Sequence, residues 1–442
     1  CKLIEAAGAD SLHIRIGPCG QHVAEFAGDL YFCGTGIEGT TGYGTQFDFT
    51  RNWQGMLKAD QSGLGIMVPV AAEIKKAVSI PVGAVTYMDP ARDPEFFESL
   101  IASGELDFIL MNRPLSVDYD YLHKLEEGRI DEIRPCTRCM HCHWDAADDG
   151  NLTFSCRTNA AHPFRFVTGQ LTGSYDPEPA ATAKNVVVVG AGPAGLEAAR
   201  VAAERGHSVT LYEKKGSVGG LLEFANNVKG PHENLSVLRS YFERQMEVLG
   251  VNVMLNTEAT ADIIAEASPD IVIAATGGVR DTLGLSDTAG TKVVGIDDFM
   301  MADIAEEVVI VGSNVQAIDA AMYLLAQGKH VQVVTPNAAS AIGAGHSFWV
   351  KTFTQPNMKA LGVRFWPEAT VTAVNDGSVT VKTATGIEQE IACGTVVEAL
   401  DCLPNDNLST GLSCEVVTVG DAARPFNIGE AICSGNAAAR AI

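Results

Sequence analysis

The stretch Val186-Val-Val-Val-Gly-Ala-Gly-Pro-Ala-Gly195 decides the fold of the central part of the chain. Its four valines form a short apolar run typical of a buried parallel strand, and an alanine-rich helix follows at Leu196–Arg205. In this pattern Gly190 ends the strand, Gly192 lets a pyrophosphate approach the backbone, and Gly195 allows close helix–strand packing. The positive N-terminal end of the helix would stabilise the phosphate charge. The stretch therefore predicts a dinucleotide-binding unit.

An acidic residue at the end of the next strand supports this interpretation. That strand ends at Glu213, 23 residues after Gly190, where a carboxylate can accept a hydrogen bond from a ribose hydroxyl. A bare glycine triplet also occurs in unrelated tight turns, but here the strand, the helix and the acid are all in place. Three later loops lie where a two-part FAD domain contacts its long cofactor. They contain Gly219-Gly220, Thr276-Gly277 and Gly420-Asp421. The expected FAD contacts are Gly190, Gly192, Pro193, Ala194, Gly195, Glu213, Gly219, Gly220, Leu221, Thr276, Gly277, Gly420 and Asp421.

A second copy of this unit occurs about 122 residues further along the chain, at Glu307–Thr335. Only its first glycine, Gly312, is retained; Asn314 and an alanine occupy the other two positions. Alanine can replace the packing glycine, so we expect the fold to persist. However, Asn314 places a side chain where the backbone should contact phosphate, and the second strand ends at Thr335 rather than at an acid. The nucleotide expected at Gly312 is NAD(P)H.

Four of the 11 cysteines lie close together in the sequence, in Cys136-Thr-Arg-Cys-Met-His-Cys142 and at Cys156. Three thiolates in so short a run can bind three corners of a cubane, and a fourth from a later turn completes it. A structural zinc site is the alternative, but such sites usually pair two separated Cys-x-x-Cys knuckles. We therefore predict a [4Fe–4S] cluster whose ligands are Cys136, Cys139, Cys142 and Cys156. The odd number of cysteines favours a reducing compartment, and we expect a cytoplasmic protein.

Three helix–strand units precede the cysteines, and their short turns imply a parallel sheet with covering helices. Their helices and strands are expected at 2–7 and 11–16, at 68–78 and 81–85, and at 94–103 and 108–111. Residues 18–66 show no clear periodicity, and so long an excursion after a strand is usually functional. In (β/α)8 barrels the loops after the last two strands commonly bind phosphate. In such a barrel Arg113 would bind the phosphate, and the alternative for an arginine that stands alone is an ordinary surface turn.

Two regions near the C-terminal end are expected to be strands. Asp376-Gly377 separates alternating runs within Val363–Val381 and predicts a β-hairpin. Thr395–Ala399 and Val416–Gly420 are short apolar runs that could complete the sheet of the first unit. The expected organisation is α/β: a partial barrel at 1–135, a cluster segment at 136–168, an FAD domain at 184–295 and 395–442, and an NAD(P)-like domain at 296–394.

The charge balance limits the classes of partner. The chain carries 54 acidic and 31 basic residues, a net charge of −23, and no Lys/Arg-rich block. We therefore expect neither nucleic acid nor an anionic membrane surface as a partner. The sequence contains no run of 18 or more apolar residues, so we expect no membrane-spanning helix.

Taken together, these segments resemble the family of 2,4-dienoyl-CoA reductase and trimethylamine dehydrogenase, whose N-terminal barrel is of the old yellow enzyme type. The residues that carry the resemblance are Asn112-Arg113-Pro114, Gly128-Arg129, Asp131–Cys136, the four cysteines, Gly190–Gly195 and Gly420-Asp421. The resemblance implies that the first 135 residues are the last three strands of a barrel whose five preceding strands are missing. It also implies FMN at the barrel mouth, with its phosphate near Ala84–Thr86 and Asn112–Arg113. His22 lies about where reductases of this family carry a catalytic histidine.

The resemblance further implies a reaction. Hydride would pass from NAD(P)H to FAD, single electrons would cross the cluster to FMN, and an activated C=C bond of an enoate or 2,4-dienoyl-CoA type would be reduced. One alternative is an amine dehydrogenase that passes electrons to an electron-transfer flavoprotein, which the altered Gly312–Ala317 turn favours. A second alternative is an inactive fragment that retains FAD and the cluster only, because a barrel lacking five strands leaves open sheet edges. A homo-oligomer is among the expected partners, and the sequence leaves its formation open.

Overall fold

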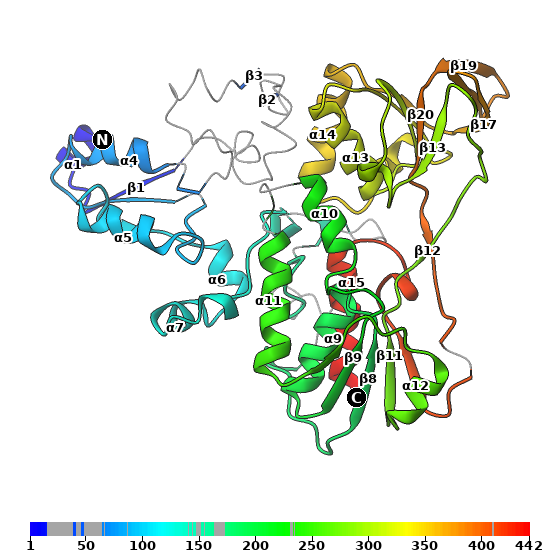
Figure 1. Cartoon of the computed structure of the whole chain (residues 1–442). Helices are drawn as coiled ribbons and strands as arrows, with labels where there is room; N and C mark the ends of the chain where they lie inside the picture. Colours follow the sequence, from blue (N-terminus) through cyan, green and yellow to red (C-terminus); the bar gives the residue numbers. More distant parts are fainter. Residues whose placement is uncertain are drawn as a thin grey trace.

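The computed structural model of the chain describes residues 1–15, 39–40, 46–47, 64–65, 67–85, 87–139, 141–143, 145–146, 152–153, 155–162, 173–229, 233, 235–408 and 411–442. Figure 1 shows three lobes: an N-terminal lobe, a first unit that contains both the first glycine turn and the C-terminal helix, and a second unit that contains the second glycine turn. Among the helices in these ranges, none combines the length and the apolar character that a membrane crossing would require.

The N-terminal lobe holds a parallel sheet in the order β1-β4-β5. The strands are β1 (Leu12–Ile14), β4 (Val82–Ala84) and β5 (Phe108–Ile109), and the helices are α1 (Lys2–Ala6), α4 (Val68–Lys75), α5 (Pro94–Ala102), α6 (Arg113–Val117) and α7 (Tyr121–Glu126). Asp93 begins α5 by accepting a hydrogen bond from the Phe96 backbone N–H. The three expected helix–strand units are thus confirmed. Most of 18–66 lies outside the described residues; its paired strands are β2 (Gly39–Thr40) and β3 (Gln46–Phe47).

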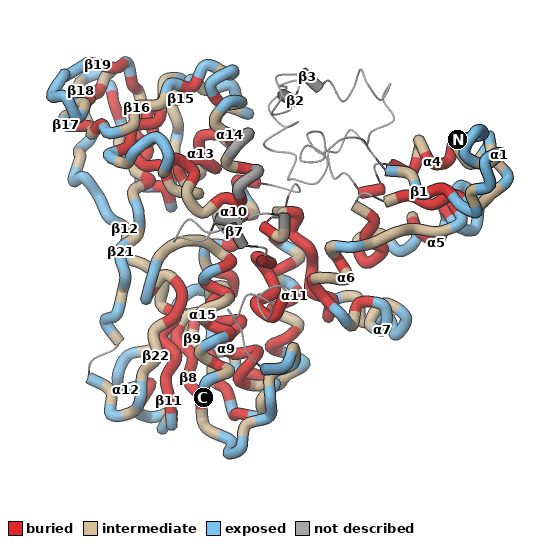
Figure 2. Tube along the Cα trace, turned by 180° about the vertical axis from the view of Figure 1, so that it is seen from behind, coloured by how far each residue is buried: buried red, intermediate tan, exposed pale blue. Residues whose placement is uncertain are grey.

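The first unit is a five-stranded parallel sheet in the order β10-β9-β8-β11-β22. Its strands are β8 (Asn185–Val189), β9 (Ser208–Tyr212), β10 (Asn252–Met254), β11 (Ile271–Ala274) and β22 (Glu415–Thr418). Its helices are α9 (Pro193–Glu204), α10 (Leu221–Lys229), α11 (Leu235–Val248), α12 (Ala261–Glu266) and α15 (Ile428–Ala441). Figure 2 shows the central strands β8 and β11 buried and α12 largely exposed. The expected Val416–Gly420 strand is confirmed as β22.

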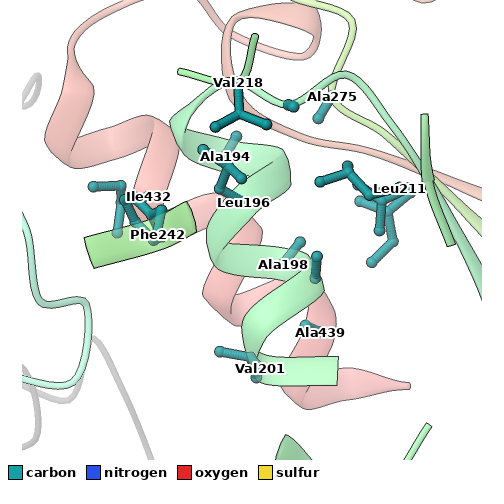
Figure 3. Close-up of a cluster of buried hydrophobic side chains, with 14 of the residues drawn as sticks. Ala194, Leu196, Ala198, Val201, Leu211, Val218, Phe242, Ala275, Ile432 and Ala439 are labelled. Carbon is teal, nitrogen blue, oxygen red and sulfur yellow. The ribbon is translucent and has the colours of Figure 1, made fainter. Parts of the chain in front are cut away.

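Glycines let α15 pack directly on α9. A Cβ at Gly435 would lie 2.1 Å from the Ala194 carbonyl oxygen, and a Cβ at Gly420 would lie 2.7 Å from the Ala194 Cβ. Figure 3 shows the core that this contact extends, with residues of α9 facing Ile432 and Ala439 of α15 and Phe242 of α11. The two helices can approach this closely only because no side chain separates them.

The second unit repeats the arrangement with a parallel sheet in the order β13-β20-β14-β15-β16. Its strands are β13 (Lys292–Gly295), β14 (Glu307–Val311), β15 (His330–Val334), β16 (Arg364–Trp366) and β20 (Thr395–Glu398), and its helices are α13 (Val315–Ala326) and α14 (Phe348–Ala360). An antiparallel sheet of β17 (Ala369–Asn375), β18 (Ser378–Thr383) and β19 (Glu388–Ala392) packs against it. Asn375 pairs with Ser378, so Asp376-Gly377 is a two-residue loop and the expected hairpin is confirmed.

The expectation that Thr395–Ala399 completes the first sheet is wrong. These residues form β20, which lies between β13 and β14 in the second sheet. Val396 and Val397 are fully buried there, as an interior strand covered on both faces requires. The strands at 292–295 and 395–398, assigned to the FAD domain from the sequence, therefore belong to the second unit.

Short elements connect these parts. The antiparallel pair β12 (Val279–Arg280) and β21 (Cys402–Leu403) carries the chain between the two units. The others are β6 (Asp145–Ala146), β7 (Leu152–Thr153) and 3-10 turns at Ile130–Glu132, His141–His143, Phe299–Met301, Ala339–Ala341 and Gly420–Ala422. The described parts of the chain confirm the α/β class, with part of a parallel barrel-type sheet, a cysteine-rich segment and two Rossmann-like units.

We predict that Gly435→Ala destabilises the first unit. The new methyl group would overlap a backbone oxygen that cannot rotate away, so the free energy of unfolding should fall by about 2 kcal/mol. Chemical unfolding followed by circular dichroism measures this change. Gly295→Ala is the matched control, because its Cβ would meet no atom within 4 Å, and it should change stability by less than about 0.5 kcal/mol. Equal stability of the two variants would contradict the packing argument.

Candidate functional site

The first glycine turn is held by two close backbone contacts. A Cβ at Gly190 would lie 2.3 Å from the Ala275 carbonyl oxygen, and Gly190 has a φ of +100°. A Cβ at Gly195 would lie 1.9 Å from the Gly190 carbonyl oxygen. Gly192 differs, because a Cβ there would meet nothing within 4 Å. The space beside Gly192, at the N-terminus of α9, is therefore open, as close approach of a phosphate to the backbone requires.

Glu213 lies against this turn at the end of β9. It is 8% exposed, and its two carboxylate oxygens accept hydrogen bonds from the backbone N–H groups of Ala191 and Lys215, each at 2.8 Å. These bonds fix the carboxylate beside the turn. Each oxygen has a second lone pair, so a ribose hydroxyl can still donate to it.

The remaining expected FAD contacts meet at the same sheet edge. The Gly219 N–H donates to the Ala191 carbonyl at 2.8 Å, and a Cβ at Gly220 would lie 3.1 Å from the Gly192 Cα. Thr276 and Gly277 follow β11, Gly420 and Asp421 follow β22, and Leu221 begins α10. Burial raises the pKa of Asp421, which accepts a hydrogen bond from the Phe426 N–H. Carboxyl ends of parallel strands meet at one edge, and here they surround one open turn.

The four cysteines lie together, close to Val117 at the end of α6. Cys136 and Cys156 are buried and pack with Val117, whereas Cys139 and Cys142 are partly buried. The pKa of the Cys142 thiol is raised by burial and also by the neighbouring thiols of the other three, and Arg113 acts in the opposite direction. The four thiols are thus close enough to interact electrostatically.

The two metal sites considered from the sequence differ in how their donors are arranged. Within the described ranges, no three His, Cys, Asp or Glu side chains converge as ligands of a single ion. A zinc site requires four donors at about 2.0–2.3 Å from one point. A cubane spreads its cysteines over four irons, so its ligands need not converge in this way.

Arg113 joins the cysteines to the barrel part of the chain. It begins α6 after β5, and its charge acts on both Cys136 and Asp89. Asn112 precedes it and accepts a hydrogen bond from the Ser116 hydroxyl at 3.2 Å. Ala84 is fully buried at the end of β4. The expected phosphate contacts therefore lie at the carboxyl ends of neighbouring strands, whereas His22 and Thr86 lie outside the described residues.

Sequence reasoning missed a contact between Arg138 and Tyr87. Arg138 lies between two of the cysteines, is 1% exposed and has a φ of +57°. Its guanidinium stacks over the Tyr87 ring at 4.2 Å from the centroid, close enough for a cation–π interaction. Left-handed backbone is costly for a residue other than glycine, and such strain concentrates at functional sites. The contact connects the loop that carries Cys136 and Cys139 to Tyr87, in the segment after β4.

The second glycine turn is closed. Gly312 keeps its role, since a Cβ there would lie 2.0 Å from the Ala399 carbonyl oxygen. The Asn314 side chain accepts a hydrogen bond from the Ala317 N–H at 2.9 Å and donates to the Ala399 and Leu400 carbonyls at 3.1 and 3.2 Å. It therefore caps α13 where a phosphate would bind. A phosphate at this turn would therefore meet the Asn314 side chain, whereas the equivalent position at Gly192 is open.

Similar proteins agree with the resemblance inferred from the sequence. The chain is 36% identical over 285 residues to an NADH oxidase from Thermoanaerobacter brockii, covering 63% of this chain and 42% of that protein. The structure is similar to 2-naphthoyl-CoA reductase, with a TM-score of 0.73, 30% identity, and coverage of 86% of this chain and 57% of that one. It is also similar to histamine dehydrogenase from Rhizobium sp. 4-9, with a TM-score of 0.69, 25% identity, and coverage of 86% and 58%.

The chain thus spans about half the length of these proteins. All three are named as oxidoreductases, which agrees with the order of sheet, cysteines and glycine turns described above. Residues 184–421, more than half of the chain, match the family described as pyridine nucleotide-disulphide oxidoreductase, and the chain belongs to that family.

Proposed function

We propose that this chain is the FAD- and [4Fe–4S]-binding part of an oxidoreductase that reduces the activated C=C bond of an enoate or an unsaturated CoA ester. The observation that carries the proposal is the open glycine turn at Gly192, which lies in one chain with four gathered cysteines and the barrel-type strands. NADH or NADPH is the proposed electron donor. The chemistry supplied by bound flavin and cluster is hydride and single-electron transfer.

The residues of the first unit bind and orient the FAD in this proposal. The N-terminal end of α9 stabilises the pyrophosphate charge, and the missing side chain at Gly192 allows its close approach. The Glu213 carboxylate, held by two backbone N–H groups, accepts from the ribose. Gly219, Gly220, Leu221, Thr276, Gly277, Gly420 and Asp421 form the rim.

Cys136, Cys139, Cys142 and Cys156 are the proposed cluster ligands. The stacked pair of Arg138 and Tyr87 holds the cysteine loop against the barrel part. There Ala84, Asn112 and Arg113 are the proposed phosphate contacts of FMN, and His22 is proposed to hold or donate a proton at the substrate. Two flavin sites would then lie on either side of the cysteines.

The relatives support the two halves of this reaction separately. The name of the NADH oxidase supports a nicotinamide donor, and that of 2-naphthoyl-CoA reductase supports an unsaturated CoA ester as acceptor. A second candidate is an amine dehydrogenase that passes electrons to an electron-transfer flavoprotein. The Asn314 cap favours it, because such an enzyme needs no nicotinamide at the second turn.

An anaerobic titration separates the two candidates. The purified chain, loaded with FAD and FMN, is mixed with NADH, NADPH or a methylated amine, and flavin absorbance is followed. The first candidate predicts bleaching by NADH or NADPH and reoxidation by an α,β-unsaturated CoA ester. Bleaching by the amine alone would replace it with the second candidate.

We predict that Gly192→Ala weakens FAD binding without unfolding the protein. The methyl group meets no protein atom but occupies the space of the phosphate, so the FAD dissociation constant should rise at least about tenfold. Flavin fluorescence titration of the apoprotein measures it. Apoprotein stability should change by less than about 1 kcal/mol, the scale of a helix N-cap effect. Unchanged FAD affinity would contradict the placement of the cofactor; Gly295→Ala is the control.

We predict that Cys139→Ser loses the cluster. The anaerobically purified chain should contain about four iron and four sulfide ions per molecule, and the variant should contain substantially fewer. Iron, sulfide and zinc analysis gives the readout. Cys414→Ser, at a partly buried cysteine outside the cysteine segment, should keep the full content. About one zinc ion and no sulfide in the unmodified chain would instead establish a structural zinc site.

A further inference from the structure

Five buried polar side chains form a continuous network through three parts of the molecule. Arg157 belongs to the cysteine segment. In the first unit, Lys229 ends α10 and Glu233 lies between α10 and α11. In the second unit, Asp319 lies on α13 and His346 lies between β15 and α14. Each is at most 8% exposed. Figure 1 shows α10 between the two units, and it packs against both α11 and α13. The network therefore joins the cysteine segment to the second unit.

The contacts follow one another without a break. The Arg157 guanidinium forms an ion pair with one Glu233 oxygen, and the Lys229 ammonium lies 3.0 Å from the other. The same ammonium lies 3.0 Å from an Asp319 oxygen. That oxygen also lies 3.1 Å from Nε2 of His346, whose pKa is lowered by burial.

The charges of this network balance. Arg157 and Lys229 supply two positive charges, Glu233 and Asp319 supply two negative charges, and a neutral His346 adds none. Buried ions are tolerated when they are paired, and removing one partner leaves an uncompensated charge. Water screens such a charge only weakly in the interior, so its field reaches neighbouring groups.

The positive end of the network lies beside the cysteines. Arg157 directly follows Cys156, and its Nη2 donates to the Thr137 hydroxyl at 3.0 Å. Thr137 in turn follows Cys136. A cation at this place favours an added electron on a group held by these cysteines, and the Glu233 carboxylate opposes that effect.

We propose that this ion network sets the reduction potential of the [4Fe–4S] cluster and extends that control to the second unit through Asp319. The inference rests on the proposed function only in requiring that the cysteines hold a cluster. Arg157 raises the potential, Glu233 lowers it, and Lys229 offsets both carboxylates. Asp319 lies on α13, the helix that Asn314 caps. A shift of this helix would change the ion pair between Asp319 and Lys229. That change would alter the electric field at Arg157.

The test is a redox titration of the full chain with its cluster, followed by electron paramagnetic resonance. Dithionite is the donor, and one electron is added per oxidised cluster. Arg157→Gln should lower the reduction equilibrium constant about tenfold, which is about 59 mV for one electron. Glu233→Gln should raise it by a similar factor. Asp319→Asn, one contact further away, should raise it about threefold.

The opposite signs separate tuning from a merely structural role, because loosened packing would not follow the sign of the removed charge. Asp107→Asn is the control: it removes one charge from the Lys75–Asp107 pair of the N-terminal lobe and should leave the potential unchanged. Shifts of one sign for all network variants, or no shifts, would overturn the proposal. If Arg157→Gln fails to retain the cluster, Lys229→Gln takes its place as the variant that removes a positive charge and should lower the constant. An unmodified chain without iron would instead refute the proposed function, and the inference with it.

Discussion

The packing of the first unit depends on three glycines near Ala194, because a side chain at any of them would separate the elements that meet there. Gly195 lets α9 begin against the end of β8, Gly420 lets the last strand turn beside it, and Gly435 lets α15 cross it. A Cβ at any of these three positions would overlap a neighbouring atom. The helix N-terminus is therefore fixed at the sheet edge by contacts behind it. Its front, at Gly192, remains open to a ligand.

Local patterns made much of this fold predictable. The valine run, the glycine turn and the Asp376-Gly377 loop follow rules that involve only neighbouring residues, and the structure agrees with each of them. The sheet to which Thr395–Ala399 belongs was not predictable in this way. A strand buried on both faces is uniformly apolar, so its sequence carries no periodicity that could identify its neighbours. Only the pairing of β20 with β13 and β14 assigns it.

The candidate site was predictable to a similar extent. The spacing of the cysteines and glycines predicted which residues gather, because residues on short loops are neighbours in sequence. The ion network could not be recognised, since Arg157 and Glu233 are 76 residues apart, and Lys229 and Asp319 are 90 apart. In so acidic a chain, each of these charges resembles an ordinary surface residue. The Arg138–Tyr87 stack was hidden for the same reason, because it joins two different loops.

The short ribbon of β12 and β21 has a consequence for how such chains are assembled. Val279 pairs with Leu403 and Arg280 with Cys402, so the chain enters and leaves the second unit at adjacent points. The first sheet is completed by β22 after the chain has returned. The second unit is therefore an insertion whose two chain connections lie side by side in this ribbon. Genetic recombination at that junction could exchange the whole unit in a single event and leave every hydrogen bond of the first sheet in place.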